Sequence, residues 1–510
     1  MTWRWARRRS SAASSDCPFT GLAGGAERVY KLLLAWKYLR RKLAPLFAAM
    51  AVTLCTAMTV IVISVMGGFL DTLRDAARGV TGDLIVLGGL QGFPAYDGLV
   101  DALEAHPEID AAVPVLETFG LLKILRGTDP VQVQGVDLDA LEGVIAVRDT
   151  LLWDEADRRE RLEGWSGVHP ESMLERIRAG RLDGGGEGPG SEPLAVLGVE
   201  TNPAQSRGED GSYSFDNAMV GYGVELTVVP LTEAGGIQDL DASTRRFRVV
   251  NEFKSGLYQV DSQTVMVPFD TLQSMLEMGP PTVRVGADAF GEGGRLERRP
   301  ELARTHQVVM SSPAEGADLE RVRDAAQAIV DGYYAQFPDL RVAVPRVVTW
   351  RDKHGQLITA VENEKGLVTF LFGVISIVAV VMVASTFYMI VLEKTRDIGV
   401  LRAIGAARSG VAAMFLTYGL AIGLLGAVLG LALAAAVVLN LNAIQDGIAA
   451  VTGWRMWDPR TYFFDQIPAR IDPAEAVWIG LGGVLSAVLG AVIPAVLAAR
   501  LDPVRSLRYE

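Results

Sequence analysis

Two long runs without a single charged residue constrain this chain more than any other feature. They cover residues 366–392 and 411–439 and are dense in valine, isoleucine, leucine, alanine and phenylalanine. A helix needs about 20 apolar residues to cross the hydrocarbon of a bilayer, so each run is long enough to span a membrane. The chain therefore contains at least two transmembrane helices, which a short polar connector joins.

The connector, residues 393–410, carries its apolar residues in a helical pattern. Ile398, Leu401 and Ile404 recur at i, i+3 and i+6, which predicts a short helix with one apolar face. Charged residues stand beside that face, namely Glu393, Arg396, Asp397 and Arg402. A helix of this kind between two spans offers a surface on which another protein can act.

Two further apolar stretches, residues 43–68 and 476–497, predict a first and a fourth span. Lysines and arginines cluster before the first span, in the connector and after the last span, as in Arg41, Lys394, Arg402 and Arg500. Positive residues favour the cytosolic side of a membrane, so we expect both termini and the connector in the cytosol. Residues 69–363 then lie outside the cell membrane.

Composition fits a protein of mixed character. Half of the 510 residues are hydrophobic, yet 21% are charged, which is too apolar for an ordinary soluble enzyme and too charged for a chain that lies wholly in the membrane. The net charge of −12 argues against nucleic acid as a partner. Only two cysteines occur, Cys17 and Cys55, so neighbouring cysteines cannot form a structural disulfide.

The region 69–363 interleaves strand and helix patterns. Strands are predicted at 82–87, 112–124 and 131–136, followed by several shorter ones, and helices at 96–106, 270–278 and 319–334. Charged or glycine-rich segments at 151–193 and 286–315 are interpreted as insertions or mobile loops. We therefore predict an α-helical membrane protein with four spans, plus a large extracytoplasmic α+β domain inserted between helices 1 and 2. A membrane-proximal porter-like subdomain and a distal subdomain are expected within it.

Four smaller segments complete the predicted organisation. Residues 1–27 are expected to form a disordered cytosolic arm, and residues 28–42 an amphipathic helix on the cytosolic leaflet or, alternatively, a plain helical start of the first span. Residues 440–475 are expected to form an external loop and residues 498–510 a cytosolic tail.

Small residues in the spans predict close helix packing rather than a transport path. They are Gly419, Gly423, Gly426 and Gly430 in the third span and Gly482 and Gly490 in the fourth. The threonines of the first span, Thr53, Thr56 and Thr59, are expected to bond to carbonyls of their own helix.

The sequence carries no recognisable catalytic chemistry. The phosphate-binding pattern GxxxxGK[ST] and the patterns HExxH and GxSxG do not occur, and the four histidines never stand at metal-ligand spacing. No Asp, Glu, Lys, Arg or His lies inside the apolar runs, which speaks against a proton-coupled transporter or an ion channel. We expect no bound metal or cofactor, and energy supplied by a partner.

Several motifs stand out, namely Glu364-Lys365 before an apolar span, EKTRDIGVLRAIGA at 393–406, FLTYGLAIGLLGAVLG at 415–430, SVMGGFLDTLRD at 64–75, FKSGLYQVDSQTVMVPFDTLQ at 253–273, YFFDQIP at 462–468 and DPVRSLRYE at 502–510. Together they resemble the FtsX-like permease family of ABC transporters, most closely its lipoprotein-releasing (LolC/LolE) branch. The insertions make this chain longer than typical members of the branch.

The resemblance implies a non-catalytic permease subunit of the cell inner membrane. A separate cytosolic ABC ATPase would bind ATP and Mg²⁺, and a second permease subunit, identical or different, would complete the transporter. The work would be to pull a lipoprotein out of the outer leaflet and hand it to a periplasmic carrier. A related MacB- or FtsX-type mechanotransmitter for efflux or cell-wall regulation is one alternative. A membrane-anchored receptor that needs no ATPase is another.

The resemblance also suggests roles for particular residues. Ile398, Leu401 and Ile404 would dock in a groove of the ATPase, with Glu393, Arg396, Asp397 and Arg402 around them. Gly399 would allow close backbone approach, and Gly405 would end the helix as a C-cap. Lipid-modified cargo would enter at the outer ends of spans one and two, near Val65, Met66, Phe69 and Phe372.

Overall fold

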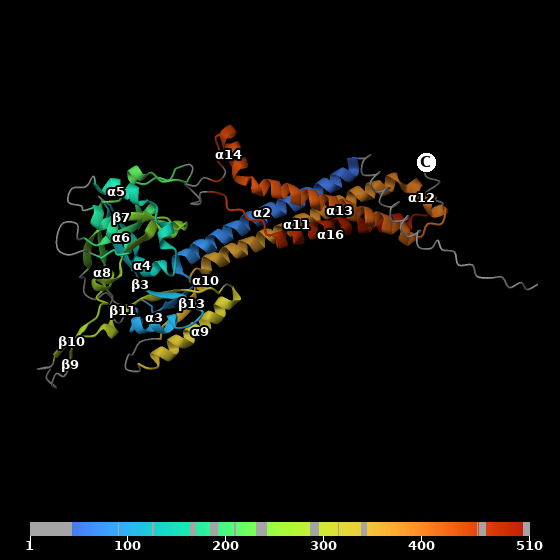
Figure 1. Cartoon of the computed structure of the whole chain (residues 1–510). Helices are drawn as coiled ribbons and strands as arrows, with labels where there is room; N and C mark the ends of the chain where they lie inside the picture. Colours follow the sequence, from blue (N-terminus) through green and yellow to red (C-terminus); the bar gives the residue numbers. More distant parts are fainter. Residues whose placement is uncertain are drawn as a thin grey trace, which may run out of the picture. The chain divides into compact units, whose positions relative to one another are not determined.

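The computed structural model describes residues 43–502 except positions 90, 125–126, 164–169, 184–191, 209–210, 231–241, 286–294, 315, 338–343, 456 and 458–465. The expected arm 1–27, the amphipathic helix 28–42 and most of the tail lie outside the described residues. Two compact units are present (Figure 1). One comprises the described parts of 1–67, 365–441 and 469–510, and the other those of 68–364 and 442–468.

The first unit is a bundle of long apolar helices, each long and apolar enough to cross a membrane. These four helices are α2 (Leu43–Thr81), α11 (Gly355–Glu393), α13 (Arg408–Leu439) and α16 (Pro473–Arg500). The predicted fold class of four spans is therefore confirmed. All four helices are longer than the predicted spans, two of them by more than ten residues: α2 continues to Thr81, and α11 already begins at Gly355. The extension of α2 ends just before Gly82, which has a positive φ of 67°.

Glycines bring the helices of this bundle into close contact. A Cβ atom on Gly423 would lie 2.9 Å from Ala487 Cβ on α16, and one on Gly430 would lie 2.8 Å from the carbonyl oxygen of Thr53 on α2. Gly419 and Gly426 likewise face α16 and α2, and Gly490 faces α11. The expectation for Gly482 is wrong, because this residue is exposed with no atom near its Cβ position. Its neighbour Gly483 lies against Thr56 instead.

The threonines of α2 divide into two groups. Thr53 and Thr59 donate hydrogen bonds to the carbonyls of Ala49 and Cys55 in the preceding turn, at 2.9 and 2.8 Å, as predicted. The buried Thr56 hydroxyl has no hydrogen-bond partner among the described residues. Its side chain lies against the small residues Gly430 and Gly483, so Thr56 contributes to packing.

The second unit contains a nine-stranded sheet in the order β13-β1-β12-β3-β4-β8-β5-β7-β6. The strands are β1 (Leu84–Leu87), β3 (Ala111–Ile124), β4 (Gly127–Val136), β5 (Leu194–Gly198), β6 (Gly223–Val228), β7 (Ser243–Phe253), β8 (Thr264–Pro268), β12 (Gln307–Ser311) and β13 (Arg346–Thr349). Because β3 also pairs with β6, the six strands from β3 to β6 close on themselves as a barrel. The large α+β domain between spans one and two is thus confirmed.

Strand β3 belongs to both parts of this sheet. Residues 111–115 pair with β12 in the open part, and residues 116–124 pair with β4 in the barrel. The barrel encloses apolar side chains such as Leu116, Leu226 and Phe247, to which α8 (Phe269–Met275) adds Leu272. The two parts correspond to the two expected subdomains, but they share one strand.

Helices cover both faces of the open part. Leu84, Val308 and Val347 point to one face, where α3 (Tyr96–Glu104) and α9 (Ala317–Tyr334) pack. Ile85 and Val309 point to the other face, against α4 (Leu138–Glu142) and α6 (Pro170–Arg178). The expectation that 286–315 is an insertion or mobile loop is therefore wrong for 307–311, which form the buried central strand β12. Charged neighbours hid this short apolar strand in the sequence.

Two other predicted irregular segments contain helices. Within 151–193, helix α5 (Glu155–Glu163) and helix α6 bury a few apolar residues, among them Leu162 and Leu174, on the core of the open sheet. Within the predicted external loop 440–475, residues Leu441–Thr452 form helix α14. Its apolar residues are spaced for a helix, so this segment is amphipathic rather than irregular.

Candidate functional site

The connector between spans two and three folds into helix α12 (Thr395–Ala403). Lys394 precedes the helix, and its Nζ atom lies 2.7 Å from Asp397 Oδ2, which joins the first turn to the end of α11. The hydroxyl of Thr395 donates to the carbonyls of Val391 and Leu392 at 3.0 and 2.9 Å. These local bonds hold α12 directly after the second span.

Gly405 ends α12 with a pair of reversed hydrogen bonds. Its φ is +104°, and its amide donates to Arg402 O at 3.2 Å, while the Ala406 amide donates to Leu401 O at 3.1 Å. This is the Schellman arrangement, which requires a left-handed residue at this position. The structure therefore agrees with the predicted C-cap.

Helix α12 exposes a different set of apolar residues from the one predicted. Leu401 and Ile404 are 45% and 80% exposed, and Val400 is 41% exposed. Ile398 is only 2% exposed and packs in the bundle core with Val391 and other residues. The expectation that Ile398 lies on the exposed docking face is wrong, because residues at i and i+6 are separated by about 120° around a helix. We call Val400, Leu401 and Ile404 the connector face.

The polar neighbours also differ in their surroundings. Glu393, Arg396 and Asp397 are exposed. Arg402, by contrast, donates from Nη1 to the carbonyl oxygen of Ala499 at 3.0 Å, near the end of α16. A cation at a helix C-terminus is favourable, so Arg402 ties α12 to the fourth span instead of lying free at a rim. Gly399 is buried beside Ile398 and does not belong to the exposed surface.

The residues predicted for a substrate path are all half-buried. Val65 and Met66 lie on the α2 part of the first unit, and Phe372 lies on α11 of the same unit. Phe69 lies on the part of α2 that belongs to the second unit. Their role in a substrate path remains a prediction.

Asp83, which sequence reasoning missed, joins the end of α2 to the sheet. Its carboxylate accepts bonds from Arg78 on α2 and from the Ser312 amide after β12, the latter at 2.8 Å. Its backbone carbonyl accepts from the amide of Trp350, at 3.0 Å, where α10 (Trp350–Lys353) begins. The extension of α2 and the start of α11 are also joined, by Arg74 and Glu362 at 2.8 Å. Local patterns could not reveal the pairs Asp83–Ser312 and Arg74–Glu362, because their partners are more than 200 residues apart in the chain.

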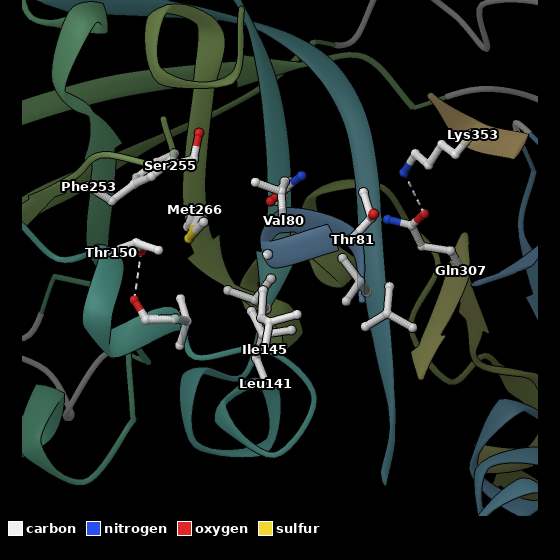
Figure 2. Close-up of a pocket in the computed structure, with 16 residues that line it drawn as sticks. Val80, Thr81, Leu141, Ile145, Thr150, Phe253, Ser255, Met266, Gln307 and Lys353 are labelled. Carbon is white, nitrogen blue, oxygen red and sulfur yellow. Dashed lines mark hydrogen bonds between the residues drawn. The ribbon is translucent and has the colours of Figure 1, made fainter. Parts of the chain in front are cut away.

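A small pocket lies beside this joint (Figure 2). Val80 and Thr81 at the end of α2 line it, together with Leu141, Ile145 and Met266. The polar end holds Lys353 and Gln307, in contact at 3.1 Å. Lys353 also pairs with Glu117 at 2.9 Å, so its charge is compensated.

His354, which follows α10, also lies near the residues that join α2 to the sheet, because α10 begins at the contact between Trp350 and Asp83. Burial and the neighbouring charge of Lys353 lower the pKa of His354. A neutral imidazole therefore fits this position near neutral pH. Among the described residues, no group of three or more His, Cys, Asp or Glu side chains is arranged to hold a metal ion.

Comparisons with known proteins agree with this architecture. Residues 369–503 match the model of the FtsX-like permease C-terminal family. The LolC lipoprotein-releasing transmembrane protein of Haemophilus influenzae is 26% identical over 229 residues, which is 44% of this chain and half of the length of that relative. LolE of the same organism is 21% identical over 485 residues, covering 93% of this chain and 98% of the relative. LolC of Xylella fastidiosa is 21% identical over 476 residues, which cover 91% of this chain and 94% of the relative.

Solved structures give weaker matches. The periplasmic region of MacB from Actinobacillus actinomycetemcomitans is 12% identical and aligns over 55% of this chain and 94% of its own, with a TM-score of 0.27. The extracellular domain of the transporter YknZ from Gram-positive bacteria is 12% identical and aligns over 52% of this chain and 99% of its own, with a TM-score of 0.25. Scores at this level do not establish a shared fold.

The described part of the chain has four helices that are long and apolar enough to cross a membrane, and a large domain is inserted between the first two. Together with the permease homologues, these features indicate a multi-pass inner-membrane protein with a periplasmic domain. Residues 369–503 are an FtsX-like permease domain, and the homologues over most of the chain are LolC and LolE. The chain is therefore similar over most of its length to ABC-transporter permeases of the FtsX/LolC/LolE type. Permeases of this type are generally non-catalytic and imply an ATPase and a partner permease.

Proposed function

We propose that this chain is a mechanotransmitting permease that extracts lipoproteins from the outer leaflet of the inner membrane for a periplasmic carrier. A separate cytosolic ATPase would bind ATP and Mg²⁺, hydrolyse the ATP and move α12. Homology to LolC and LolE over more than nine-tenths of the chain supports the substrate class. The connector face supports the coupling to an ATPase, and it is the observation on which the mechanism depends.

The connector face has the composition of a docking surface. Three apolar side chains, Val400, Leu401 and Ile404, stand exposed within two turns, with Arg396 and Asp397 exposed on the same short helix. A few apolar side chains in a partner's groove commonly supply most of the binding energy of an interface. Arg402 and Ile398 hold the helix to the bundle on its other side, so a push on the connector face reaches the spans.

Two helices provide a route for this motion. Both α2 and α11 run for 39 residues without interruption, from the spans into residues of the periplasmic unit. In that unit, Arg78–Asp83 and Arg74–Glu362 fix their ends to the sheet and to each other. We infer that displacement of these helices deforms the periplasmic domain.

The decisive test is the variant Leu401→Asp. Leu401 is 45% exposed, so we expect the variant to insert and fold normally. An unpaired charge in the apolar groove of an ATPase would cost several kcal/mol, so co-purification of the ATPase and ATP-driven lipoprotein release should be lost. The matched control is Arg396→Gln on the exposed surface of the same helix, which should weaken activity only modestly.

Normal ATPase association and transport by a well-expressed Leu401→Asp protein would refute the coupling role. The connector would then be only a polar link between two spans. A receptor without an ATPase, the alternative from another class, would gain support from the same result, because it has no use for the connector face.

The proposed orientation has a separate test. A cysteine placed at Ser409, after the connector, should resist a membrane-impermeant thiol reagent in intact cells, whereas one at Thr128 in the periplasmic domain should react. Both positions are exposed. Both variants would be made in a chain without Cys17 and Cys55. Labelling of the Ser409→Cys protein from outside would contradict the cytosolic location of the connector.

The substrate class can be tested at the predicted entry. Photocrosslinkers at Val65, Met66, Phe69 and Phe372 should capture a lipoprotein from ATP-depleted membranes, because an acyl chain gains about 0.8 kcal/mol for each CH₂ that it buries. Capture of a lipoprotein elsewhere, with none at these four positions, would overturn the path. If the purified transporter bound no lipoprotein at all but retained its ATPase, the MacB- or FtsX-type mechanotransmitter would be favoured.

A further inference from the structure

Helix α14, which follows the third span, carries an apolar face that the described part of the chain covers only in part. Ile444, Ile448 and Val451 are 41%, 38% and 87% exposed, and Trp454 just after the helix is 60% exposed. Residues 444, 448 and 451 fall within about 60° of one another around a helix, so they form one stripe. We call these three residues and Trp454 the α14 face.

Another side of α14 is occupied by contacts within its own segment. The side-chain amide of Gln445 pairs with the backbone of Trp457, donating to its carbonyl at 3.2 Å and accepting from its amide at 3.0 Å. Asn442 Oδ1 accepts from the Ile467 amide at 2.9 Å. The polar residues thus hold the helix to Trp457 and Ile467, and the apolar stripe lies on another side of the helix.

The packing of α13 on α16 shows at which level of the bundle the third span ends. Gly419 lies against Ala491, Gly423 against Ala487, and Leu431 against Gly480. The two helices are therefore antiparallel, with a constant register along these contacts. Eight residues beyond the Leu431–Gly480 contact, the same register places Leu439 at the level of Asp472. Asp472 caps the first turn of α16, accepting from the amides of Ala474 and Glu475.

Charged side chains begin at this level of the bundle. Lys365, in α11 just before the charge-free run of the second span, pairs with Glu475 at 2.7 Å. Ion pairs of this kind belong to the headgroup region and not to the hydrocarbon. The third span therefore ends at the membrane surface. Helix α14 starts two residues later, at Leu441, so its first residue is within about 8 Å of Leu439.

We propose that α14 lies on the outer membrane surface, with the α14 face inserted among the lipids at the boundary between headgroups and acyl chains. An amphipathic helix with a tryptophan at one end suits this boundary, where the apolar face is buried and the indole reaches the headgroups. The exposed side chain of Leu439, at 78%, continues the apolar surface of α13 towards α14.

The charge of this segment indicates which lipids it would accept. The only charged residue in α14 is Asp446, and the side chain of Arg455 lies 3.6 Å from it. With no excess of positive charge, the helix has no electrostatic preference for anionic lipids. The occupant is thus a zwitterionic or neutral lipid surface, held by apolar burial.

The test compares two faces of the same helix in the full-length chain. Cys17 and Cys55 are replaced, and a single cysteine is introduced as Ile448→Cys on the α14 face or as Ala450→Cys on the opposite, exposed face. Each is labelled with bimane in nanodiscs of phosphatidylcholine. With acyl-brominated lipid, we expect about threefold stronger quenching at position 448 than at position 450, and the reverse order with aqueous iodide.

A second pair, Val451→Cys and Ala443→Cys, should repeat this pattern, which excludes a local artefact at one position. Equal quenching of both faces by brominated lipid would overturn the proposal. Protection of the Ile448→Cys label from both quenchers would also overturn it, because protein would then cover the face. Neither ATPase nor lipoprotein is present, so the result does not depend on the proposed transport function.

Discussion

The bundle and the periplasmic unit use the same apolar residue types in opposite ways. In α13, Val428 is 62% exposed, while Gly423 and Gly430 form the buried contacts. In the barrel, Leu226 and Phe247 are fully buried, and polar side chains such as Thr227 and Arg246 face outward. Lipid removes the drive to bury leucine or valine, so the bundle depends on close approach of small residues, whereas the barrel depends on burial from water.

This contrast predicts that large-to-small changes damage the barrel most. Phe247→Ala, at a fully buried position, should lower the free energy of unfolding of the periplasmic unit by about 3–5 kcal/mol. Phe119→Ala, at a side chain that is 78% exposed, should change it by less than about 0.5 kcal/mol. Urea unfolding of both variants measures the difference. Equal midpoints would mean that Phe247 is not part of a packed core.

The opposite change should damage the bundle. Gly423→Leu would place side-chain atoms against Ala487 and Val484, at positions where even a Cβ lies 2.9–3.1 Å away, so we expect a loss of about 1–3 kcal/mol. Gly482→Leu, with open space around it, should be tolerated. Thermal stability in detergent compares the two. A tolerated Gly423→Leu would show that small residues do not set the helix spacing.

At the connector, a smaller and more local effect is expected from Gly405→Val. A β-branched residue strains at a φ of +104°, so the end of α12 should fray at a cost of about 1–2 kcal/mol. ATPase binding should weaken without loss of folding. Gly410→Val, in the first turn of α13 and with no atom near its Cβ position, is the control and should behave like the parent. Co-purification of the ATPase reports on both.

The smallest effect concerns pH and the buried Glu252 of the periplasmic unit. Burial raises the pKa of Glu252, although its carboxylate accepts bonds from Trp153 Nε1 at 2.7 Å and Asn202 Nδ2 at 2.8 Å. A raised carboxyl pKa favours the protonated form in the folded state. Its contribution to stability is therefore complete below pH 4.5, the ordinary value, and is lost as the pH rises through the raised pKa.

In the parent protein, the free energy of unfolding should fall as the pH rises above 4.5, and in the Glu252→Gln variant it should fall less. Urea midpoints measured at a series of pH values would show this as a smaller slope in the variant. Glu225→Gln provides a control of opposite sign, because the hydrogen bond from Lys123 lowers the pKa of Glu225 on the surface. An unchanged pH slope in the Glu252→Gln variant would mean that this carboxyl does not titrate differently in the folded and unfolded states.

The sequence predicted the elements whose physics is local. Charge-free runs identified the spans, and the small residues of α13 identified its contacts. Long-range partners escaped: Ala499, which binds Arg402, lies 97 residues further on, and Asp83 meets Ser312 across 229 residues. The buried side of α12 was misassigned because the spacing of Ile398, Leu401 and Ile404 spreads over a wide arc. The packing of α12 on the bundle determines which of the three residues is buried, and it buries Ile398.

Strand β3 has a mechanical meaning beyond its place in the topology. A single continuous strand, residues 111–124, is the last strand of the open sheet and also a strand of the barrel. No linker absorbs movement between the two. We expect a displacement of β1 and β13, the strands attached to α2 and α10, to be transmitted through β3 to the barrel. The two parts of the periplasmic domain should therefore move as one elastic body and not as two rigid bodies about a hinge.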